Sequence, residues 1–152
     1  MFSNLKTKFH IYLINRFSVI SRQSIADKYL NGTGLEIGAM NLPLIPKRTS
    51  KISYLDRCSH LESEKIFPDL GGKLVPVDII ADIDNLGNLD IGRFDFIIAN
   101  HVFEHLENPI SFIFWAVNCL NNNGKLFMAL PDKRFTFDAG RKITSNEHLF
   151  EE

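Results

Sequence analysis

The sequence has few cysteines, little excess charge and no long apolar run. Its 152 residues include two cysteines, Cys58 and Cys119, which lie far apart and in no metal-ligand spacing. We therefore expect neither a disulfide framework nor a zinc motif, and a reduced, cytoplasmic protein is the simple interpretation. The formal net charge is −1. This value argues against a nucleic-acid binder that works by neutralising phosphates.

The amino-terminal segment lacks the features of a membrane span or a signal peptide. Its apolar run, residues 11–14, is broken by Asn15 and Arg16, whereas a membrane-spanning helix needs about 20 apolar residues. No small-residue cleavage site follows. Apolar residues recur here at helical spacing and basic residues outnumber acidic ones, so residues 1–30 predict an amphipathic helical cap on a domain of residues 31–152. A peripheral contact with a membrane surface is the less favoured alternative.

After residue 31, short apolar runs alternate with helix-length segments. This alternation predicts an α/β fold with a mostly parallel, Rossmann-like sheet and helices on both faces. The predicted strands are residues 35–37, 51–56, 74–78, 94–100 and 125–130, and the predicted helices are residues 63–70 and 109–120. The third strand is expected at an edge of the sheet, because Pro76 cannot donate a ladder hydrogen bond. Ligands of such sheets bind at the carboxyl ends of the strands.

The predicted strand ends carry residues suited to a nucleoside. Gly38 ends the first strand, where the absence of a Cβ lets a ligand approach the backbone. Asp56 ends the second strand, at the spacing from the glycine at which Rossmann-type folds hold ribose hydroxyls. After the third strand, Asp82 could bond an adenine amino group while Ile83 packs on the ring, with Asp84 as the competing acid. A nucleotide-binding oxidoreductase is an alternative, but its Gly-x-Gly-x-x-Gly motif is absent from the sequence.

Four blocks of sequence together resemble class I S-adenosylmethionine-dependent methyltransferases of the type 11 group. The blocks are Leu-Glu-Ile-Gly at 35–38, Tyr-Leu-Asp at 54–56, Asp-Ile-Asp-Asn-Leu at 82–86 and Asn-His-Val-Phe-Glu-His at 100–105. The resemblance extends over roughly residues 32–138. It implies S-adenosylmethionine as the cofactor and a sheet of order 3-2-1-4-5-7-6, of which the five strands 3-2-1-4-5 are found here. The chain therefore looks short at its carboxyl-terminal side, with an open sheet edge that a second copy or a partner chain could cover.

The resemblance also implies roles for individual residues. Glu36 would organise the glycine turn or meet the methionine amino group, and Gly38 and Ala39 would line the methionine part. The remaining implied contacts are ribose at Asp56, adenine at Arg57, Asp82 and Ile83, and the sulfonium region at Asn100 and His101. One departure is Met40, which stands where the family usually has a second glycine. A degenerate, non-catalytic domain that acts as a binding module is therefore the main alternative function.

The expected reaction moves a methyl group to a small-molecule or glycan acceptor that the sequence does not identify. His101 is the first candidate for a catalytic base and Asp132 is the second. His101, Glu104 and His105 could instead hold a divalent ion, although the commoner role of Glu104 and His105 is to fix the loop. No metal is predicted on balance. The polar segment after residue 131 is expected either to contact substrate or to be a solvated end.

Overall fold

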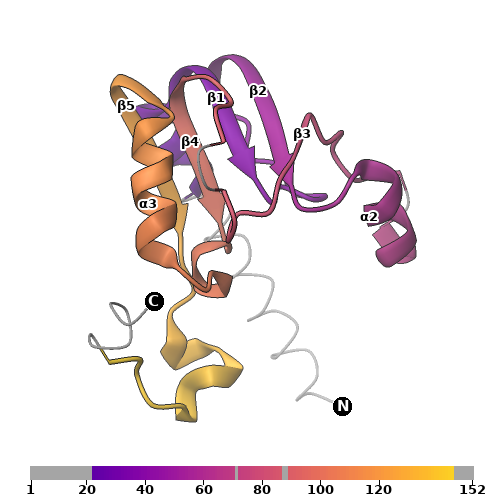
Figure 1. Cartoon of the computed structure of the whole chain (residues 1–152), viewed down its shortest axis with the longest axis vertical. Helices are drawn as coiled ribbons and strands as arrows, with labels where there is room; N and C mark the ends of the chain where they lie inside the picture. The colour runs from indigo at the N-terminus through magenta and orange to yellow at the C-terminus, as the bar shows by residue number, and fades with distance from the viewer. Residues whose placement is uncertain (1–21, 71, 87–88, 146–152) are drawn as a thin grey trace, which may run out of the picture.

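The computed structural model describes residues 22–70, 72–86 and 89–145, and it contains a single five-stranded sheet (Figure 1). Its strand order is β3-β2-β1-β4-β5, and every pair of neighbouring strands is parallel. The predicted fold class and strand order are thereby confirmed. The strands are β1 (Asn31–Ile37), β2 (Arg48–Asp56), β3 (Ile79–Ile80), β4 (Phe94–Asn100) and β5 (Leu120–Ala129).

The centre of the sheet is buried on both faces. Residues 96–99 of β4 are apolar and each is 0% exposed, as expected of a strand with layers on either side. One face packs against helix α3 (Pro109–Asn118) through Phe112, Trp115 and Ala116. The opposite face packs against the helical residues 22–29. Helices therefore cover both faces, as the sequence predicts.

Helix α3 begins where its sequence favours a helix start. The Asn108 side chain accepts a hydrogen bond from the Ser111 backbone N–H at 2.9 Å, and Pro109 occupies the first turn. Both features satisfy or remove backbone donors that the helix itself leaves unpaired. The second helix, α2 (His60–Ile66), begins with a capping box between Ser59 and Glu62. It lies beyond β3, at the opposite end of the sheet from α3 (Figure 1).

Four of the five strands differ from the prediction in their bounds. The first two begin earlier than predicted, at Asn31 rather than residue 35 and at Arg48 rather than residue 51. The third strand is Ile79–Ile80 rather than residues 74–78. Upstream of it, Val75 donates its N–H to the Met40 carbonyl of the glycine-turn loop, and this stretch reaches β2 at its end, where Asp78 donates its N–H to the Tyr54 carbonyl. The fifth strand begins at Leu120 instead of residue 125, because the stretch with three asparagines at 121–123 continues the strand through a register shift. Its irregularity is visible at Asn123, whose φ is +64°.

The remaining parts lie at the ends of the chain. The segment after β5 forms η3 (Lys133–Phe135) and η4 (Phe137–Gly140) below the sheet (Figure 1). Most of the predicted amino-terminal cap, residues 1–21, lies outside the described residues. Within the described part of the chain, no helix is both long enough and apolar enough to cross a bilayer.

Candidate functional site

The strands end at one side of the sheet, and a tight turn follows the first of them. Gly38 has φ +63° and donates its N–H to the Leu55 carbonyl of β2 at 3.0 Å. A Cβ at this position would lie 3.2 Å from Cγ2 of Val102, and its positive φ already favours glycine. Ala39 continues the turn, because its carbonyl accepts the Leu42 N–H at 3.0 Å. The backbone of this turn is thereby held close to the end of β4.

Glu36 holds the turn from inside the protein. Its side chain is buried, at 1% exposure, and both carboxylate oxygens lie within hydrogen-bond distance of the Leu44 N–H, at 3.1 and 3.0 Å. Burial raises the pKa of Glu36 to about 7, against the opposing effects of the Leu44 N–H and of Arg22. Of its two expected roles, organisation of the turn is the one that these contacts support.

Met40 occupies a backbone conformation that favours glycine. Its φ is +48°, in the left-handed region. The family pattern has a glycine at this place, and the positive φ explains why, because glycine adopts it without steric cost. The turn therefore has a left-handed residue at this place although its side chain is that of methionine.

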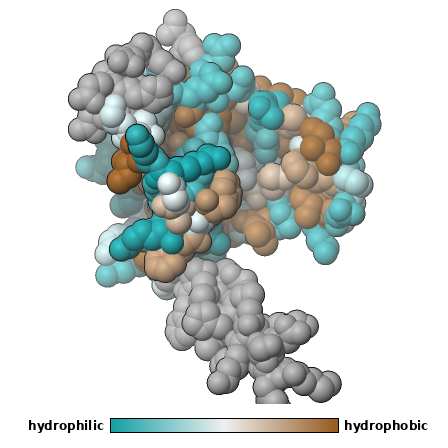
Figure 2. Space-filling view, turned by 90° about the horizontal axis from the view of Figure 1, so that it is seen from below, coloured by the Kyte–Doolittle hydropathy of each residue, from teal (hydrophilic) through white to brown (hydrophobic). Residues whose placement is uncertain are grey.

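A cavity of about 320 Å³ opens beside this turn. Its walls come from the ends of β1 and β2, from α2, and from the loops that follow β3 and β4. It is lined by Ile37, Gly38, Met40, Leu55, Asp56, Arg57, Cys58, Ser63, Ile66, Phe67, Asp82, Ile83, Asp84, Val102 and His105. Figure 2 views the molecule from this side of the sheet, where hydrophilic and hydrophobic residues are intermixed on the surface.

The two acids expected to bind a nucleoside both line the cavity. Asp56 uses Oδ1 to accept the Arg57 N–H at 2.7 Å, and its Oδ2 has no hydrogen bond to any residue that the structure describes. Asp82 accepts the Asp84 N–H at 3.2 Å. The competing acid, Asp84, accepts the Glu107 N–H at 2.8 Å and so ties two loops together. Asp84 therefore has a structural task, whereas Asp56 keeps one carboxylate oxygen available for a ligand.

The end of β4 supplies a second group of polar side chains. Oδ1 of Asn100 is buried and has no hydrogen-bond partner within the described part of the chain. His101 has φ +55°, and its N–H continues the ladder to the Ala129 carbonyl at 2.9 Å. Its Nδ1 lies 3.2 Å from Oε1 of Glu104. Asp132, the other candidate base, forms an ion pair with Arg134 at 2.6 Å, and this hydrogen-bonded partner lowers the pKa of Asp132.

Comparison with known proteins identifies the family. A family model described as a methyltransferase domain matches residues 17–152. The chain belongs to this methyltransferase domain family. Among curated proteins, no sequence matches the chain significantly.

Solved methyltransferase structures share the fold of this methyltransferase domain. The plantazolicin methyltransferase BpumL, crystallised with a pentazolic desmethylPZN analog and SAH, is 20% identical, with 95% of this chain and 60% of that chain covered and a TM-score of 0.53. A protein from Bacillus halodurans, assigned as a methyltransferase, is 17% identical, with 73% and 50% covered and a TM-score of 0.52. The domain therefore spans between one half and 60% of these two structures.

The residues of the methyltransferase domain fit the cofactor that its sequence resemblance implies. The glycine turn has no side chain at Gly38, Asp56 keeps one free carboxylate oxygen, and Asn100 has a buried oxygen without a partner among the described residues. A buried polar atom without a partner costs free energy unless a ligand or water satisfies it. The three features lie at the same edge of the sheet.

The structure brings half of the ten predicted site residues together on one cavity, which is lined by Gly38, Asp56, Arg57, Asp82 and Ile83. The other five do not line it: Glu36, Ala39, Asn100, His101 and Asp132. The sequence did not indicate the wall formed by Cys58, Ser63, Ile66 and Phe67. The capping box at Ser59 was a usable signal, because it starts α2 directly after the second strand.

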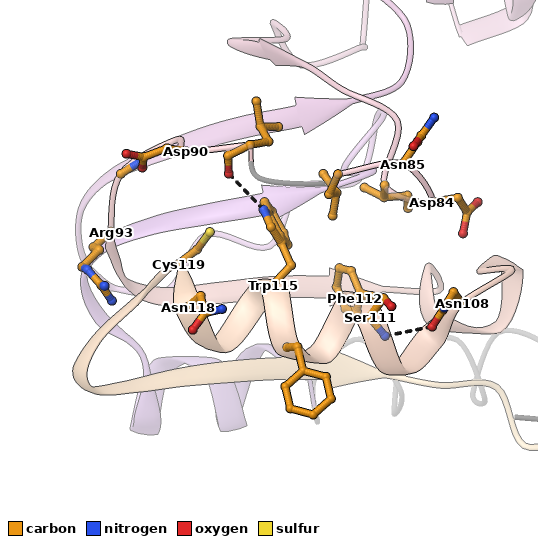
Figure 3. A pocket seen from close by; sticks show the side chains of 15 residues that line it. Asp84, Asn85, Asp90, Arg93, Asn108, Ser111, Phe112, Trp115, Asn118 and Cys119 are labelled. Carbon is orange, nitrogen blue, oxygen red and sulfur yellow. Dashed lines mark hydrogen bonds between the residues drawn. The ribbon is translucent and has the colours of Figure 1, made fainter. Parts of the chain in front are cut away.

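A larger cleft, of about 660 Å³, lies on the α3 face of the methyltransferase domain (Figure 3). It runs between α3 and the loop that joins β3 to β4. Trp115 closes its floor by donating its indole N–H to the Leu89 carbonyl at 3.3 Å. Asp84 and Ile83 line both this cleft and the smaller cavity. The predicted cofactor residues other than Ile83 do not line it, so the smaller cavity remains the candidate cofactor site.

Among the described residues, no group of three or more His, Cys, Asp or Glu side chains is placed to hold a metal ion. Glu104 contacts His101 instead, and the His105 backbone N–H bonds the Val102 carbonyl at 3.0 Å. These contacts fix the loop after β4, which is the structural role weighed above for Glu104 and His105.

Proposed function

We propose that this domain binds S-adenosylmethionine in the 320 Å³ cavity and transfers its methyl group to a small-molecule or glycan acceptor. The observation that supports the proposal best is the convergence of Gly38, Asp56 and Asp82 on one cavity at the carboxyl ends of parallel strands. Ligands of open α/β sheets bind at this edge.

The proposed contacts follow the order of the strands. Asp56 accepts hydrogen bonds from the ribose hydroxyls through its free oxygen. Asp82 accepts from the adenine amino group, Ile83 packs on the ring and Arg57 flanks it. Gly38 and Ala39 line the methionine part, while Asn100 offers its unpartnered oxygen near the sulfonium.

The bound cofactor supplies an activated methyl group, so the protein mainly provides proximity and orientation. An acceptor hydroxyl must also lose a proton, which requires a base. His101 suits this role better than Asp132. The Arg134 guanidinium holds the pKa of Asp132 below its usual range, which weakens that carboxylate as a base.

The acceptor and the partners are proposed at the level of chemical class. BpumL is crystallised with a desmethylPZN analog. For this domain, the proposed methyl acceptor is a small molecule or a glycan. A second copy or a partner chain is proposed to cover the edge of β5, which pairs with no further strand among the described residues. A cytoplasmic location is proposed from cysteine usage alone.

Calorimetric titration of the full chain with S-adenosylhomocysteine tests the cofactor assignment. We expect binding, and we expect Asp56→Ala to weaken it about 10- to 100-fold, as for loss of a hydrogen bond to a charged group. The matched control is Asp69→Ala, which removes an exposed acid in η1 (Pro68–Leu70) outside the cavity.

Two outcomes would contradict the proposal. One is a folded sample that binds no S-adenosylhomocysteine at millimolar concentration, which favours a non-catalytic domain. The other is tight binding of a nicotinamide dinucleotide in its place, which favours the oxidoreductase alternative.

A further inference from the structure

We propose that Glu104 is a positioning residue, which holds the His101 imidazole in the tautomer whose Nε2 accepts a proton from the methyl acceptor. This inference rests on the proposed function and deepens it, because it identifies the acceptor as a nucleophile that must lose a proton. A hydroxyl group is the simplest such nucleophile.

The backbone fixes both residues of the pair. His101 is the first residue after β4 and is tied to the end of β5 by its hydrogen bond to the Ala129 carbonyl. Its φ of +55° lies in the left-handed region, which disfavours residues other than glycine. The single turn η2 (Phe103–His105) then carries Glu104 within reach of His101, three residues earlier in the chain.

The side chains meet through one particular nitrogen. Oε1 of Glu104 lies 3.2 Å from Nδ1 of His101. Because a carboxylate can only accept, this contact requires a proton on Nδ1. In the neutral imidazole the proton on Nδ1 leaves Nε2 with a lone pair, and Nε2 has no hydrogen-bond partner among the described residues.

The two side chains of the pair differ in their exposure to solvent. The Glu104 side chain is 24% exposed, whereas the His101 side chain is 55% exposed. The carboxylate is therefore the more sheltered partner, and the imidazole keeps an open side for an acceptor. The pair also lies close to the cofactor cavity, since Val102 follows His101 directly and approaches the glycine turn.

The chemical step balances without another reactant. The acceptor oxygen forms a bond to the methyl carbon while the carbon–sulfur bond breaks, and the sulfur keeps that electron pair as a neutral thioether. The hydroxyl proton passes to Nε2 of His101. The resulting imidazolium is stabilised by the Glu104 carboxylate, in the way that a buried acid orients the histidine of a hydrolytic triad.

The test measures the tautomer directly and needs no acceptor. In the full chain labelled with 15N-histidine, we expect neutral His101 to show a protonated Nδ1 and an unprotonated Nε2. In Glu104→Ala, we expect the population to move towards the tautomer that carries its proton on Nε2. The matched control is Glu107→Ala, which removes a nearby exposed acid and is expected to leave the His101 spectrum unchanged.

Two results would overturn the inference. The first is a wild-type His101 that already carries its neutral proton on Nε2, and the second is a Glu104→Ala spectrum identical to that of the wild type. Titration with S-adenosylhomocysteine separates this test from that of the proposed function. We expect Glu104→Ala to bind it within about twofold of the wild type, which also shows that the variant is folded.

Discussion

At the scale of single residues, Glu36 links the stability of the domain to pH. Its pKa is raised from 4.5 to about 7 in the native state. The native carboxyl keeps its proton in this range while the unfolded one releases it. The free energy of unfolding should therefore fall as the pH rises from about 4.5 to about 7, by on the order of 3 kcal/mol for this group.

The measurement compares urea unfolding of the wild type and Glu36→Gln between pH 4.5 and 8. The free energy of unfolding of the wild type should fall relative to that of Glu36→Gln as the pH rises to about 7. Above that pH the difference should stay level. Glutamine does not titrate, so the variant lacks this dependence. Glu107→Gln, at an exposed position in the loop between η2 and α3, is the control. A constant difference between wild type and Glu36→Gln would contradict the assignment.

Met40 gives a second prediction at this scale. Met40→Ala and Met40→Gly both remove the side chain, but only glycine adopts φ +48° without steric cost. We expect the glycine variant to be more stable than the alanine variant by about 1 kcal/mol in urea unfolding. Equal stabilities, or a more stable alanine variant, would show that the turn is not strained.

At the scale of secondary-structure elements, Asp95 joins three strands at their amino ends. Its Oδ2 accepts the Thr33 backbone N–H at 2.8 Å, and its Oδ1 accepts the Asn121 side chain at 2.9 Å. Both β1 and β5 change register beside these contacts. A carboxylate thus replaces ladder hydrogen bonds where the pairing is irregular.

We expect Asp95→Ala to lower the urea midpoint more than Asp69→Ala does. The Thr33 N–H and the Asn121 side chain hold the pKa of Asp95 below its usual value. Its stabilising effect should therefore be present above the pKa of the unfolded carboxyl and be lost as the pH falls through the native value. Variants with equal midpoints at neutral pH would contradict this role.

The elements also show which parts of the fold could be predicted from sequence. The central strands were predictable because continuous apolar runs such as residues 94–100 have few alternatives to a buried strand. The third strand was misplaced because the residues before it divide their contacts, with Val75 bonding Met40 of the glycine-turn loop and Asp78 bonding Tyr54 of β2. Such contacts leave no local pattern.

In the candidate site, too, some residues could be predicted from the sequence and others could not. Gly38, Asp56 and Asp82 could be located because the chemistry of strand ends is fixed by topology. The pairing of Glu104 with His101 depends on a left-handed φ that histidine rarely adopts, so the sequence could not indicate it. The wall contributed by α2 depends on how that helix packs, which its composition does not specify.

At the scale of the whole molecule, helix α3, which contacts β5, carries exposed apolar residues. Phe114 of α3 is 69% exposed and Val117 is 55% exposed. Exposed apolar surface beside an unpaired strand favours association with another chain. We expect the chain to self-associate at high concentration, as measured by analytical ultracentrifugation.

The Phe114→Glu variant should reduce this association. The matched control is Phe137→Glu, because Phe137 is 89% exposed in η4, away from α3. If Phe137→Glu has the larger effect, the segment after β5 and not the α3 side is the surface of association. A wild-type chain that remains monomeric at millimolar concentration would contradict the prediction altogether.

The central position of β1 bears on how the chain folds during synthesis. The strand is made first, yet its Thr33 is fixed by Asp95, which follows 62 residues later. At about 5–20 residues per second, a ribosome needs roughly 3 to 12 seconds to cover that distance. For that time the apolar half of β1 is without its β4 neighbour. The nascent domain therefore passes through a period in which chaperone binding competes with folding.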